Sequence, residues 1–539
     1  MERRSAFRRC AGGSVMNGKT RRWTLLVLGF ALMVTLVPLA SAQAPRKGGV
    51  LHVGILGEPP ALDAHWSTTA LVETLTNHVY EGLYTLDQDN RPIPMLAEGM
   101  PTVSRDGLVY TFKLRQGVRF HNGKELGAED VVASLTRWGQ QANQGKVLFK
   151  QVAELRPVDR YTVELRLTDR SPIVVLALAI PNNFAAIYPK EIAEKYPPQQ
   201  KVTEFIGTGP FRVAEWKPDQ YLRMVRFDDY KSRGEKPNGY GGAKTAYLDE
   251  IRWIPVPEVA TRAAQVETGE LHFADDLALD QYDRLAQSQS ARPLVAKPYF
   301  WLIAVFNKKE GLMTNQKLRQ AWQAAVDIEP IMKVVAAGKP DFYRLDASLM
   351  FREVPEWHTS LPGLPYNEHN PEKAKRLMKE AGYKGEPIRF MATKEYKWMY
   401  DFAVMMKQQL EDIGFTIDLQ VVDWASLSTR RFNPKEYEVF TTGIGLGAQF
   451  DPMFQAILSC TWAGWTCDEE IQKVSQELAR ETDPKKRRGL WEQQTRLWYD
   501  KVPSIRLGDL HGLRATQKIV RGLNENTERP RFYNVWLER

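Results

Sequence analysis

Residues 110–123 read YTFKLRQGVRFHNG, and this stretch carries the strongest local structural signal in the chain. Apolar and polar side chains alternate from Tyr110 to Leu114, which is the period of a half-buried strand. The alternation resumes at Val118 after a glycine, and Asn122-Gly123 is a dipeptide typical of a tight turn. The stretch therefore predicts a β-hairpin.

Helices with clear end signals lie on its C-terminal side. The first should begin at about Ala128, after a glycine cap at Gly127. Asn370-Pro371 and Asp483-Pro484 open two later helices, and Gly382 should end the earlier of these. The apolar residues expected on the buried faces are Val131, Val132, Leu135 and Trp138; Ala374, Leu377, Met378 and Ala381; and Leu490, Leu497 and Trp498.

Short apolar stretches with the character of strands lie between these helices. They are residues 50–54, 252–256, 302–306, 388–391 and 416–421. Because helices and strands alternate along the chain, we expect an α/β fold. A chain of 539 residues should hold two to four domains.

The composition is that of a soluble globular protein, with 43% apolar and 26% charged residues. The formal charge of +8 does not indicate a nucleic-acid partner, because most of the excess lies at the N-terminus. Residues 1–42 contain seven Lys/Arg and one acidic residue, which leaves 66 basic and 64 acidic residues elsewhere.

The N-terminus has the three parts of a secretory signal. Basic residues precede an apolar run at 23–40, and Ala40-Ser41-Ala42 supplies small residues for cleavage near Ala42 or Ala44. A membrane anchor is the alternative interpretation of this run. Met16 is an alternative start, and residues 20–25 half-match a twin-arginine signal. We expect residues 1–42 to be removed and a soluble, monomeric protein to reach the periplasm.

Two motif matches are rejected on their context. Residues 13–20 fit the phosphate-binding loop G-x-x-x-x-G-K-T, but they lie in the expected signal peptide. Residues 443–448 fit the dinucleotide pattern G-x-G-x-x-A, but no helix follows them before Pro452. We interpret this second stretch as a glycine loop that lets a ligand approach the backbone. The chain has no G-x-S-x-G nucleophile motif and no paired histidine spacing, so we expect no enzyme activity, metal or cofactor.

Two cysteines remain once Cys10 is removed with the signal peptide. Cys460 and Cys467 have six residues between them. In an oxidising compartment this spacing suits a local disulfide, and two separate buried thiols are the alternative.

The motifs of the mature chain resemble, in order, those of the solute-binding proteins of peptide-type ABC importers, known as family 5. The matching segments are 58–63 (EPPALD), 79–83 (VYEGL), 110–123, 128–131 (AEDV), 207–211 (GTGPF), 318–321 (LRQA), 371–377 (PEKAKRL), 422–424 (VDW), 451–452 (DP) and 534–536 (NVW).

The resemblance implies a bilobal periplasmic-binding-protein fold of class II with an extra third domain. Lobe I would be discontinuous, with residues 45–85, 206–290 and 500–539. Domain II would be residues 86–205, and domain III, the second lobe, residues 291–499. It further implies a disulfide between Cys460 and Cys467, a small-molecule solute bound between the lobes, and delivery of that solute to a membrane permease.

Loops at strand ends supply the candidate ligand-binding residues. They are His65, Trp66, Asn307, Trp424, Gly445, Ala448, Gln449 and Asp451. We expect a receptor that captures a peptide-like or other small organic solute. The alternatives are a secreted α/β hydrolase and a periplasmic binding protein with a chaperone or signalling role.

The glycine loop departs from the dipeptide-binding pattern. Dipeptide binders of this family have Gly-Asp-Asn-Gly-Asp-Pro here, and their first aspartate pairs with the ammonium group of the ligand. Ala448 stands at that position, three residues before Asp451. When an ammonium group is enclosed without a carboxylate, nothing offsets the free-energy cost of removing it from water, which is several kcal/mol. We therefore expect a modified peptide, an opine-like compound or a sugar derivative rather than a simple dipeptide.

This difference predicts the outcome of a titration. Isothermal calorimetry with a mixed dipeptide library should show no binding at micromolar concentrations. The Ala448→Asp variant is the gain-of-function control, because it restores the carboxylate. Micromolar binding of simple dipeptides by the parent protein would contradict the expectation.

Overall fold

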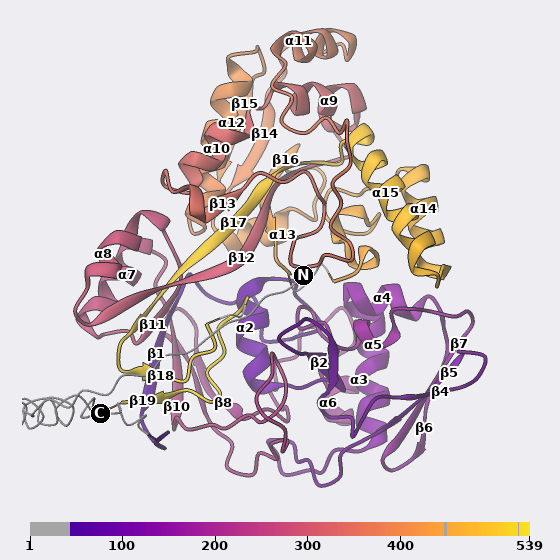
Figure 1. Ribbon diagram of the computed structural model, residues 1–539, viewed down its shortest axis with the longest axis vertical. Helices are drawn as coiled ribbons and strands as arrows, with labels where there is room; N and C mark the ends of the chain where they lie inside the picture. Colours follow the sequence, from indigo (N-terminus) through magenta and orange to yellow (C-terminus); the bar gives the residue numbers. More distant parts are fainter. Residues whose placement is uncertain (1–43, 447–449, 526–527, 539) are drawn as a thin grey trace, which may run out of the picture. The chain divides into compact units, whose positions relative to one another are not determined.

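A mixed 11-stranded sheet forms the centre of the fold, and the computed structural model describes residues 44–446, 450–525 and 528–538 (Figure 1). In order across the sheet, its strands are β15 (Ile417–Val421), β14 (Ile388–Ala392), β16 (Val439–Ile444), β12 (Ala291–Phe306), β17 (Ser504–Gln517), β11 (Phe273–Leu277), β1 (Val50–Ile55), β10 (Glu250–Pro255), β9 (Tyr221–Arg226) and β8 (Phe211–Lys217), and β13 (Tyr343–Arg344) pairs with β17 outside this row.

The two longest strands, β12 and β17, pair antiparallel in the middle of the sheet. Their register runs from Ala291 opposite Gln517 to Val305 opposite Ser504. Parallel pairs lie on both sides, with β1 between β10 and β11, and β14 between β15 and β16. The sheet joins strands from β1 to β17, and residues 46–539 form one compact unit. The predicted domain boundaries therefore stay a prediction.

The other strands of the described residues form three smaller sheets. They are β4 (Thr102–Val103), β5 (Val109–Lys113), β7 (Thr162–Leu167) and β6 (Val152–Asp159), in that order; β2 (Tyr84–Leu86) with β3 (Pro92–Pro94); and β18 (Val520–Arg521) with β19 (Trp536–Leu537).

Helices cover the sheets. They are α2 (Ala70–Val79), α3 (Ala128–Gln141), α4 (Asn143–Phe149), α5 (Val174–Ala177), α6 (Lys190–Lys195), α7 (Val259–Thr268), α8 (Tyr282–Gln287), α9 (Gln316–Ala325), α10 (Ile328–Val335), α11 (Pro371–Glu380), α12 (Lys397–Glu411), α13 (Trp424–Arg430), α14 (Glu469–Arg480) and α15 (Pro484–Lys501). The short 3₁₀ turns are η1 (Leu279–Gln281), η2 (Leu312–Thr314), η3 (Pro340–Phe342), η5 (Pro452–Phe454) and η6 (Ala456–Leu458).

The predicted hairpin forms only in part. The alternation is confirmed, because Phe112, Leu114 and Val118 are all buried. However, β5 pairs with β4 and β7, and the Asn122-Gly123 turn closes a single bridge between Arg119 and Glu125. The long strand partner of β5 is thus β7, which follows α3 and α4 in the sequence. A local turn signal could not indicate a partner so far along the chain.

The predicted helix starts are confirmed at α3, α11 and α15. The Asn370 side chain accepts the Lys373 N–H at 2.9 Å, and the Asp483 side chain accepts the Lys486 N–H at 2.9 Å. Such caps satisfy N–H groups that the first helical turn leaves without a partner. The buried face of α15 differs from the expectation: Trp491 and Trp498 are fully buried, whereas Leu490 and Leu497 are partly exposed.

A buried histidine connects α2 to the C-terminal segment. His78 Nδ1 donates to the Thr74 carbonyl at 2.8 Å, and His78 Nε2 accepts the Phe532 N–H at 3.0 Å. Both bonds together require the neutral imidazole. Burial lowers the pKa of His78 to about 3. The segment held in this way includes Arg529, which lines the cavity described below.

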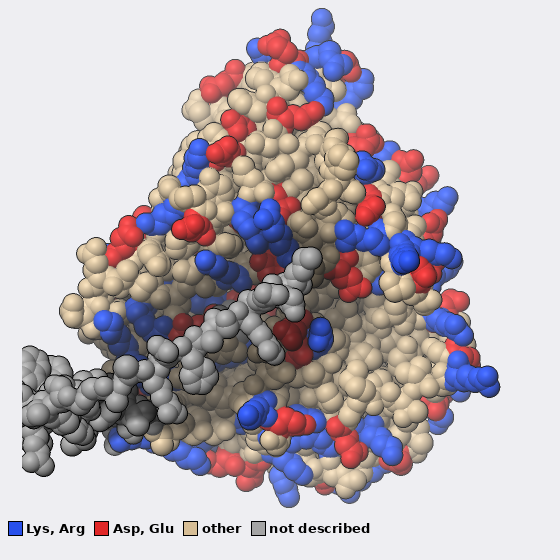
Figure 2. Space-filling view, viewed as in Figure 1, with Lys and Arg blue, Asp and Glu red and all other residues tan. Residues whose placement is uncertain are grey.

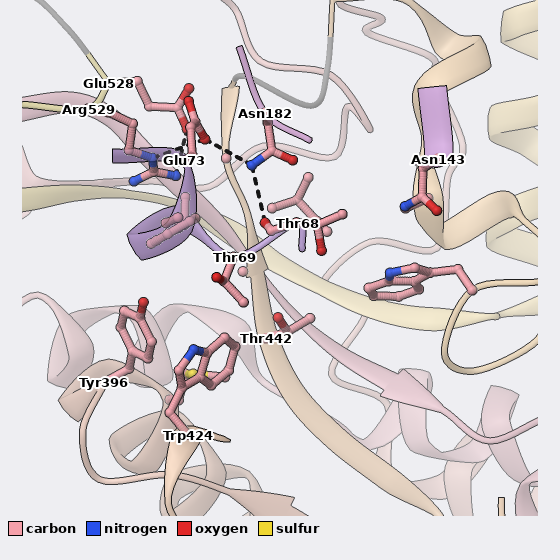
Figure 3. Close-up of a pocket in the computed structure, with 18 of the residues that line it drawn as sticks. Thr68, Thr69, Glu73, Asn143, Asn182, Tyr396, Trp424, Thr442, Glu528 and Arg529 are labelled. Atoms are coloured by element: carbon pink, nitrogen blue, oxygen red, sulfur yellow. Dashed lines mark hydrogen bonds and ion pairs between the residues drawn. The ribbon is translucent and has the colours of Figure 1, made fainter. Parts of the chain in front are cut away.

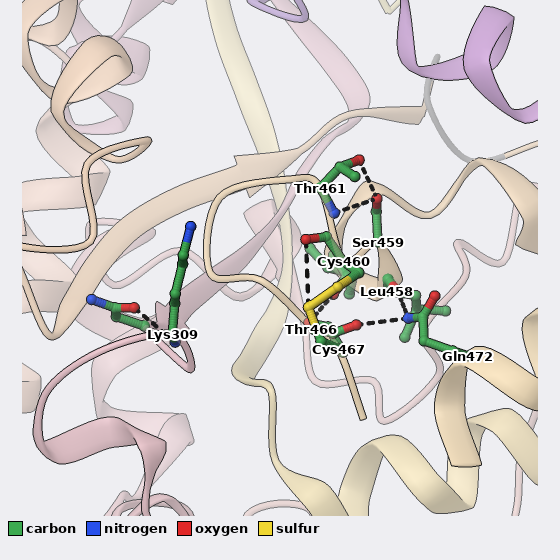
Figure 4. The surroundings of a disulfide bond; sticks show 10 residues. Lys309, Leu458, Ser459, Cys460, Thr461, Thr466, Cys467 and Gln472 are labelled. Atoms are coloured by element: carbon green, nitrogen blue, oxygen red, sulfur yellow. Dashed lines mark hydrogen bonds between the residues drawn. A yellow bond between two sulfur atoms is a disulfide. The ribbon is translucent and has the colours of Figure 1, made fainter. Parts of the chain in front are cut away.

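The predicted disulfide between Cys460 and Cys467 is confirmed, with a Cα–Cα distance of 4.5 Å (Figure 4). Gln472 supports the loop that it closes by donating to the carbonyls of Leu458 and Thr466, at 2.8 and 2.6 Å.

Among the described residues, no helix is long and apolar enough to cross a membrane. The apolar run at 23–40 and the cleavage sites at Ala42 lie outside the described residues.

Free-thiol labelling tests the disulfide. The unfolded, unreduced mature protein should contain no reactive thiol. Replacing both cysteines by serine should lower the free energy of unfolding by about 2–3 kcal/mol, because the closed loop is short. Two titratable thiols in the exported protein would contradict the pairing.

His78 should make the protein sensitive to acid. Its pKa is lower in the folded state than in the unfolded state. Below pH 6.5 the unfolded chain therefore takes up a proton at this histidine that the folded protein does not. The free energy of unfolding should therefore fall by about 1.4 kcal/mol per pH unit from this group, between pH 6.5 and 3. Urea unfolding measures the slope.

The matched variant is His78→Gln, which keeps one donor and one acceptor but does not titrate. Between pH 6.5 and 4.5, the free energy of unfolding of this variant should fall less steeply with decreasing pH than that of the parent, by about 1.4 kcal/mol per pH unit. Each protein is compared with its own free energy of unfolding at pH 7.5. Identical slopes would show that His78 contributes nothing to acid unfolding.

Candidate functional site

A cavity of about 80 Å³ lies among side chains from distant parts of the chain (Figure 3). Its walls come from α2 and α4, from β12, β16, α12 and α13, and from Glu528 and Arg529 near the C-terminus. One water molecule needs about 10–15 Å³ of such space. The cavity can therefore hold a small organic molecule.

A charged cluster forms one end of the cavity. Asn182 Nδ2 donates to the Glu73 carboxylate at 2.9 Å and to the Thr68 carbonyl at 3.2 Å. Arg529 lies 3.5 Å from Glu73 and 2.8 Å from Glu528. Burial alone would lower the pKa of Arg529, but the carboxylates of Glu528 and Glu73 outweigh burial and raise it. One guanidinium thus contacts two carboxylates.

Aromatic side chains form the opposite end. Tyr396 and Trp424 meet edge to face, with ring centroids 5.0 Å apart (Figure 3). Phe300 and Trp398, 5.4 Å apart, connect this end to the charged cluster, because the centre of the Phe300 ring also lies 4.9 Å from Arg529 Cζ. The backbone N–H of Trp424 donates to Glu395 Oε2 at 2.7 Å and fixes the start of α13. The indole N–H of Trp424 is buried without a hydrogen-bond partner. Walls of this kind suit a ligand with both apolar and polar groups.

Two glycines before the undescribed residues 447–449, Gly443 and Gly445, line the cavity and lie close to protein side chains. A Cβ at Gly445 would overlap the Glu528 carboxylate and lie 2.7 Å from Arg529 Nη2, and a Cβ at Gly443 would lie 2.9 Å from Phe300. These glycines therefore let protein side chains approach the strand, which puts Glu528 and Arg529 at the wall of the cavity.

The predicted ligand-binding residues divide into three groups. Trp424 and Gly445 line the cavity, and Ala448 and Gln449 lie outside the described residues. The remaining four do not line this cavity.

His65 belongs to a buried polar network next to α3. Arg137 binds Asp63 at 2.6 Å and donates to His65 Nδ1 at 3.1 Å, while His65 Nε2 donates to the Ala186 carbonyl at 2.9 Å. Burial lowers the pKa of His65 to about 3. Its neighbour Trp66 is partly exposed and lies under the Lys201 ammonium, 5.5 Å from the ring centroid. These contacts give His65 a structural role.

Asn307 and Asp451 also make structural contacts. The Asn307 side chain donates to the carbonyls of Pro434 and Tyr437 at 2.6 and 2.9 Å. Asp451 forms a two-bond ion pair with Arg487, at 2.8 and 2.9 Å, and is 3% exposed. Asp451 therefore does not replace the carboxylate that the glycine loop lacks.

Several residues of the cavity were not predicted from the sequence. They include Glu73, Asn182, Arg431, Glu528 and Arg529. A signal was present for Glu73, because it is an acidic residue among the apolar residues of α2. No sequence signal joins it to Arg529, which lies more than 400 positions further along the chain.

The described residues contain no group of three His, Cys, Asp or Glu side chains that could hold a metal ion. On the face shown in Figure 2, basic and acidic side chains are interspersed over the described surface.

Comparisons with known proteins agree on one family. The family described as "Bacterial extracellular solute-binding proteins, family 5 Middle" matches residues 91–465. The chain is 26% identical over 471 residues to the probable peptide ABC transporter periplasmic-binding protein y4tO of Sinorhizobium fredii, over 85% of this chain and 88% of that protein. It is 31% identical over 410 residues to the glutathione-binding protein GsiB of Salmonella paratyphi A, over 75% of this chain and 74% of that protein.

Solved structures show the fold. The oligopeptide-binding protein AppA of Bacillus subtilis, in complex with a nonapeptide, has a TM-score of 0.80 at 23% identity, covering 92% of this chain and 100% of AppA. AgaA of A. tumefacien R10, in complex with agropinic acid, has a TM-score of 0.78 at 23% identity, covering 91% and 99%. Both confirm the predicted α/β, bilobal periplasmic-binding-protein fold.

The family match spans most of the chain, and the 31% identity to GsiB extends over three quarters of it. The chain therefore belongs to family 5 of the bacterial extracellular solute-binding proteins.

Proposed function

We propose that this protein is a periplasmic receptor that captures a peptide-like or other small organic solute and delivers it to the permease of an ABC importer. The observation that carries the proposal is the cavity, which has a charged end at Glu73 and Arg529 and an aromatic end at Trp424. The named functions of relatives such as y4tO and GsiB support the same reading. A catalytic role is not part of the proposal, and the comparisons favour a receptor over a secreted hydrolase.

Export and domain arrangement complete the proposal. The signal peptide is cleaved near Ala42 or Ala44, and the mature protein acts as a monomer in the periplasm. Residues 45–85, 206–290 and 500–539 form lobe I, next to domain II at 86–205, and residues 291–499 form the second lobe. Solute favours the closed arrangement of the lobes only through its higher affinity for that arrangement.

Mass spectrometry of the protein purified from the periplasm tests the receptor function. Gentle conditions should preserve a bound solute, and denaturation should release it. Returning the solute at one hundred times its Kd should raise the free energy of unfolding by about 2.7 kcal/mol. A protein that carries no solute and is not stabilised by a low-molecular-mass extract of its own cells would contradict the proposal. Permease and ATPase genes beside its gene would favour import over a chaperone or signalling role.

The Trp424→Ala variant should bind the solute about 30-fold more weakly, because the aromatic wall loses a large contact area. Fluorescence titration and calorimetry measure the change. Trp216→Phe is the matched control, because Trp216 lies outside the cavity, where its indole N–H donates to Glu58 at 2.6 Å. Unchanged affinity in a correctly folded Trp424→Ala protein would assign Trp424 to the core alone.

A further inference from the structure

The loop that the disulfide closes, residues 460–467, supplies part of the cavity wall. Trp462 lies within this loop, is 6% exposed and lines the cavity. The centre of its ring lies 6.0 Å from that of Phe440 and 5.6 Å from Arg431 Cζ. Burial lowers the pKa of Arg431 to about 10, and no nearby carboxylate offsets this effect. Trp462 therefore packs against a buried cation that also lines the cavity.

The first half of the loop, residues 460–463, is hydrogen-bonded only within the loop and to the residue before it. The Trp462 carbonyl accepts the Trp465 N–H at 2.9 Å, and the Thr461 N–H donates to Ser459 Oγ at 3.1 Å (Figure 4). In the part of the chain that the structure describes, residues 460–463 make no hydrogen bond to any residue outside 459–467. Hydrogen bonds to the body of the protein therefore do not fix the position of Trp462.

The second half of the loop is anchored to the body of the protein. The Gly464 carbonyl accepts the Lys308 N–H at 3.1 Å, and Thr466 Oγ1 donates to the Ile457 carbonyl at 2.7 Å. Cys467 directly follows Thr466, so the disulfide joins the first half of the loop to an anchored residue. Apart from the chain itself, this bond is the covalent link that restrains the segment carrying Trp462.

Solvent can reach the disulfide. Cys467 is exposed and Cys460 is partly exposed. A thiolate of a dithiol can attack Cys467 Sγ, which breaks the S–S bond, forms a mixed disulfide and leaves a thiolate on Cys460. The second thiol of the dithiol then forms its own disulfide and releases Cys467. The dithiol thus loses two electrons and two protons, and both cysteines become thiols.

We propose that the Cys460–Cys467 disulfide is a redox-sensitive device that positions Trp462, so that reduction by a dithiol releases this ring from the cavity wall and lowers the affinity for solute. The inference rests on the proposed receptor function. In the oxidised protein the ring is already in place, whereas in the reduced protein the solute must also order residues 460–463. A wall that is formed in about one reduced molecule in ten lowers the affinity about 10-fold.

Calorimetry on oxidised and reduced protein tests the effect on affinity. The probe is the compound that denaturation releases from the periplasmic protein, and dithiothreitol is the reductant. Thiol labelling shows that both cysteines are reduced, and urea unfolding shows that the protein is folded. The affinity should fall about 10-fold on reduction and return on reoxidation. Equal affinities would overturn the inference and leave the receptor function intact, and a protein that releases no compound and binds none would overturn both.

Variants separate the disulfide from other effects of the reductant. The double variant Cys460→Ser/Cys467→Ser should bind the compound like the reduced parent, with or without dithiothreitol. Trp462→Ala should bind weakly in both redox states, because it lacks the ring that the disulfide positions. A Trp462→Ala protein whose affinity still falls 10-fold on reduction would overturn the role of Trp462.

Trp465→Phe is the matched control. Trp465 belongs to the same loop but does not line the cavity, and its ring stacks on Tyr437 with centroids 6.3 Å apart. This variant should keep the affinity of the parent and its 10-fold response to reduction. Loss of that response in Trp465→Phe would overturn the assignment to Trp462.

Fluorine NMR tests the movement of Trp462 without any solute. The protein is labelled with 5-fluorotryptophan, and the resonance of Trp462 is the one that is missing from Trp462→Phe. Reduction should shift or broaden this resonance and leave that of Trp216 unchanged, because Trp216 lies outside the cavity and donates to Glu58. A Trp462 resonance that is identical in oxidised and fully reduced protein would overturn the inference, whatever the protein binds.

Discussion

The antiparallel ladder between β12 and β17 is the constraint on which the other parts of the structure depend. Nearly every residue of β17 is buried, including the charged residues Arg506, Asp509 and Arg514. Each has a partner: Arg506 binds Asp509 at 2.6 Å, and Arg514 binds Asp275 of β11 at 2.7 Å. Arg506 and Asp509 lie on the same strand, whereas a shift of β17 by one residue would turn Arg514 to the opposite face and away from Asp275, so this second buried pair favours the observed register.

The positions of the cavity walls depend on this ladder, because β12 pairs with both β17 and β16. Pairing of β12 with β16 puts Leu302 opposite Gly443, and the absence of a side chain there makes room for Phe300 and Trp398. Gly445 likewise makes room for Glu528 and Arg529. The walls are thus positioned by backbone pairing, and the glycines determine how closely neighbouring side chains can approach. A site built on paired strands holds its groups more precisely than one built on loops alone.

Much of the fold could be predicted because its signals are local. Strands β1, β10, β14 and β15 and the capped helices α11 and α15 appear in the sequence as apolar runs or cap residues. The central strand β12 was predicted only at its end, residues 302–306, because Pro293, Lys297 and Pro298 interrupt the apolar pattern of its first half. That half forms a strand because β17 pairs with it, which is a tertiary effect.

The site could be predicted only where a residue follows a strand in sequence, as Trp424 follows β15. The same rule selected Asn307 and Asp451, whose side chains turn toward carbonyl groups and Arg487 instead. Arg431 and Arg529 gave no signal, since nothing in the sequence distinguishes an arginine that has an acidic partner from one that has none. Charge pairing is a property of the folded chain, and a motif search does not see it.

The position of β17 and of the segment after it has a consequence for the order of folding. Residues paired across the central ladder lie about 200 positions apart, and closing such a loop costs on the order of 5 kcal/mol of chain entropy before any contact compensates. The segment at Phe532, which His78 holds, is made later still. An incomplete chain has neither the middle of its sheet nor a closed cavity wall. The nascent chain must therefore wait for β17 and for the segment at Phe532, and it remains partly folded with exposed strand edges until both have been made.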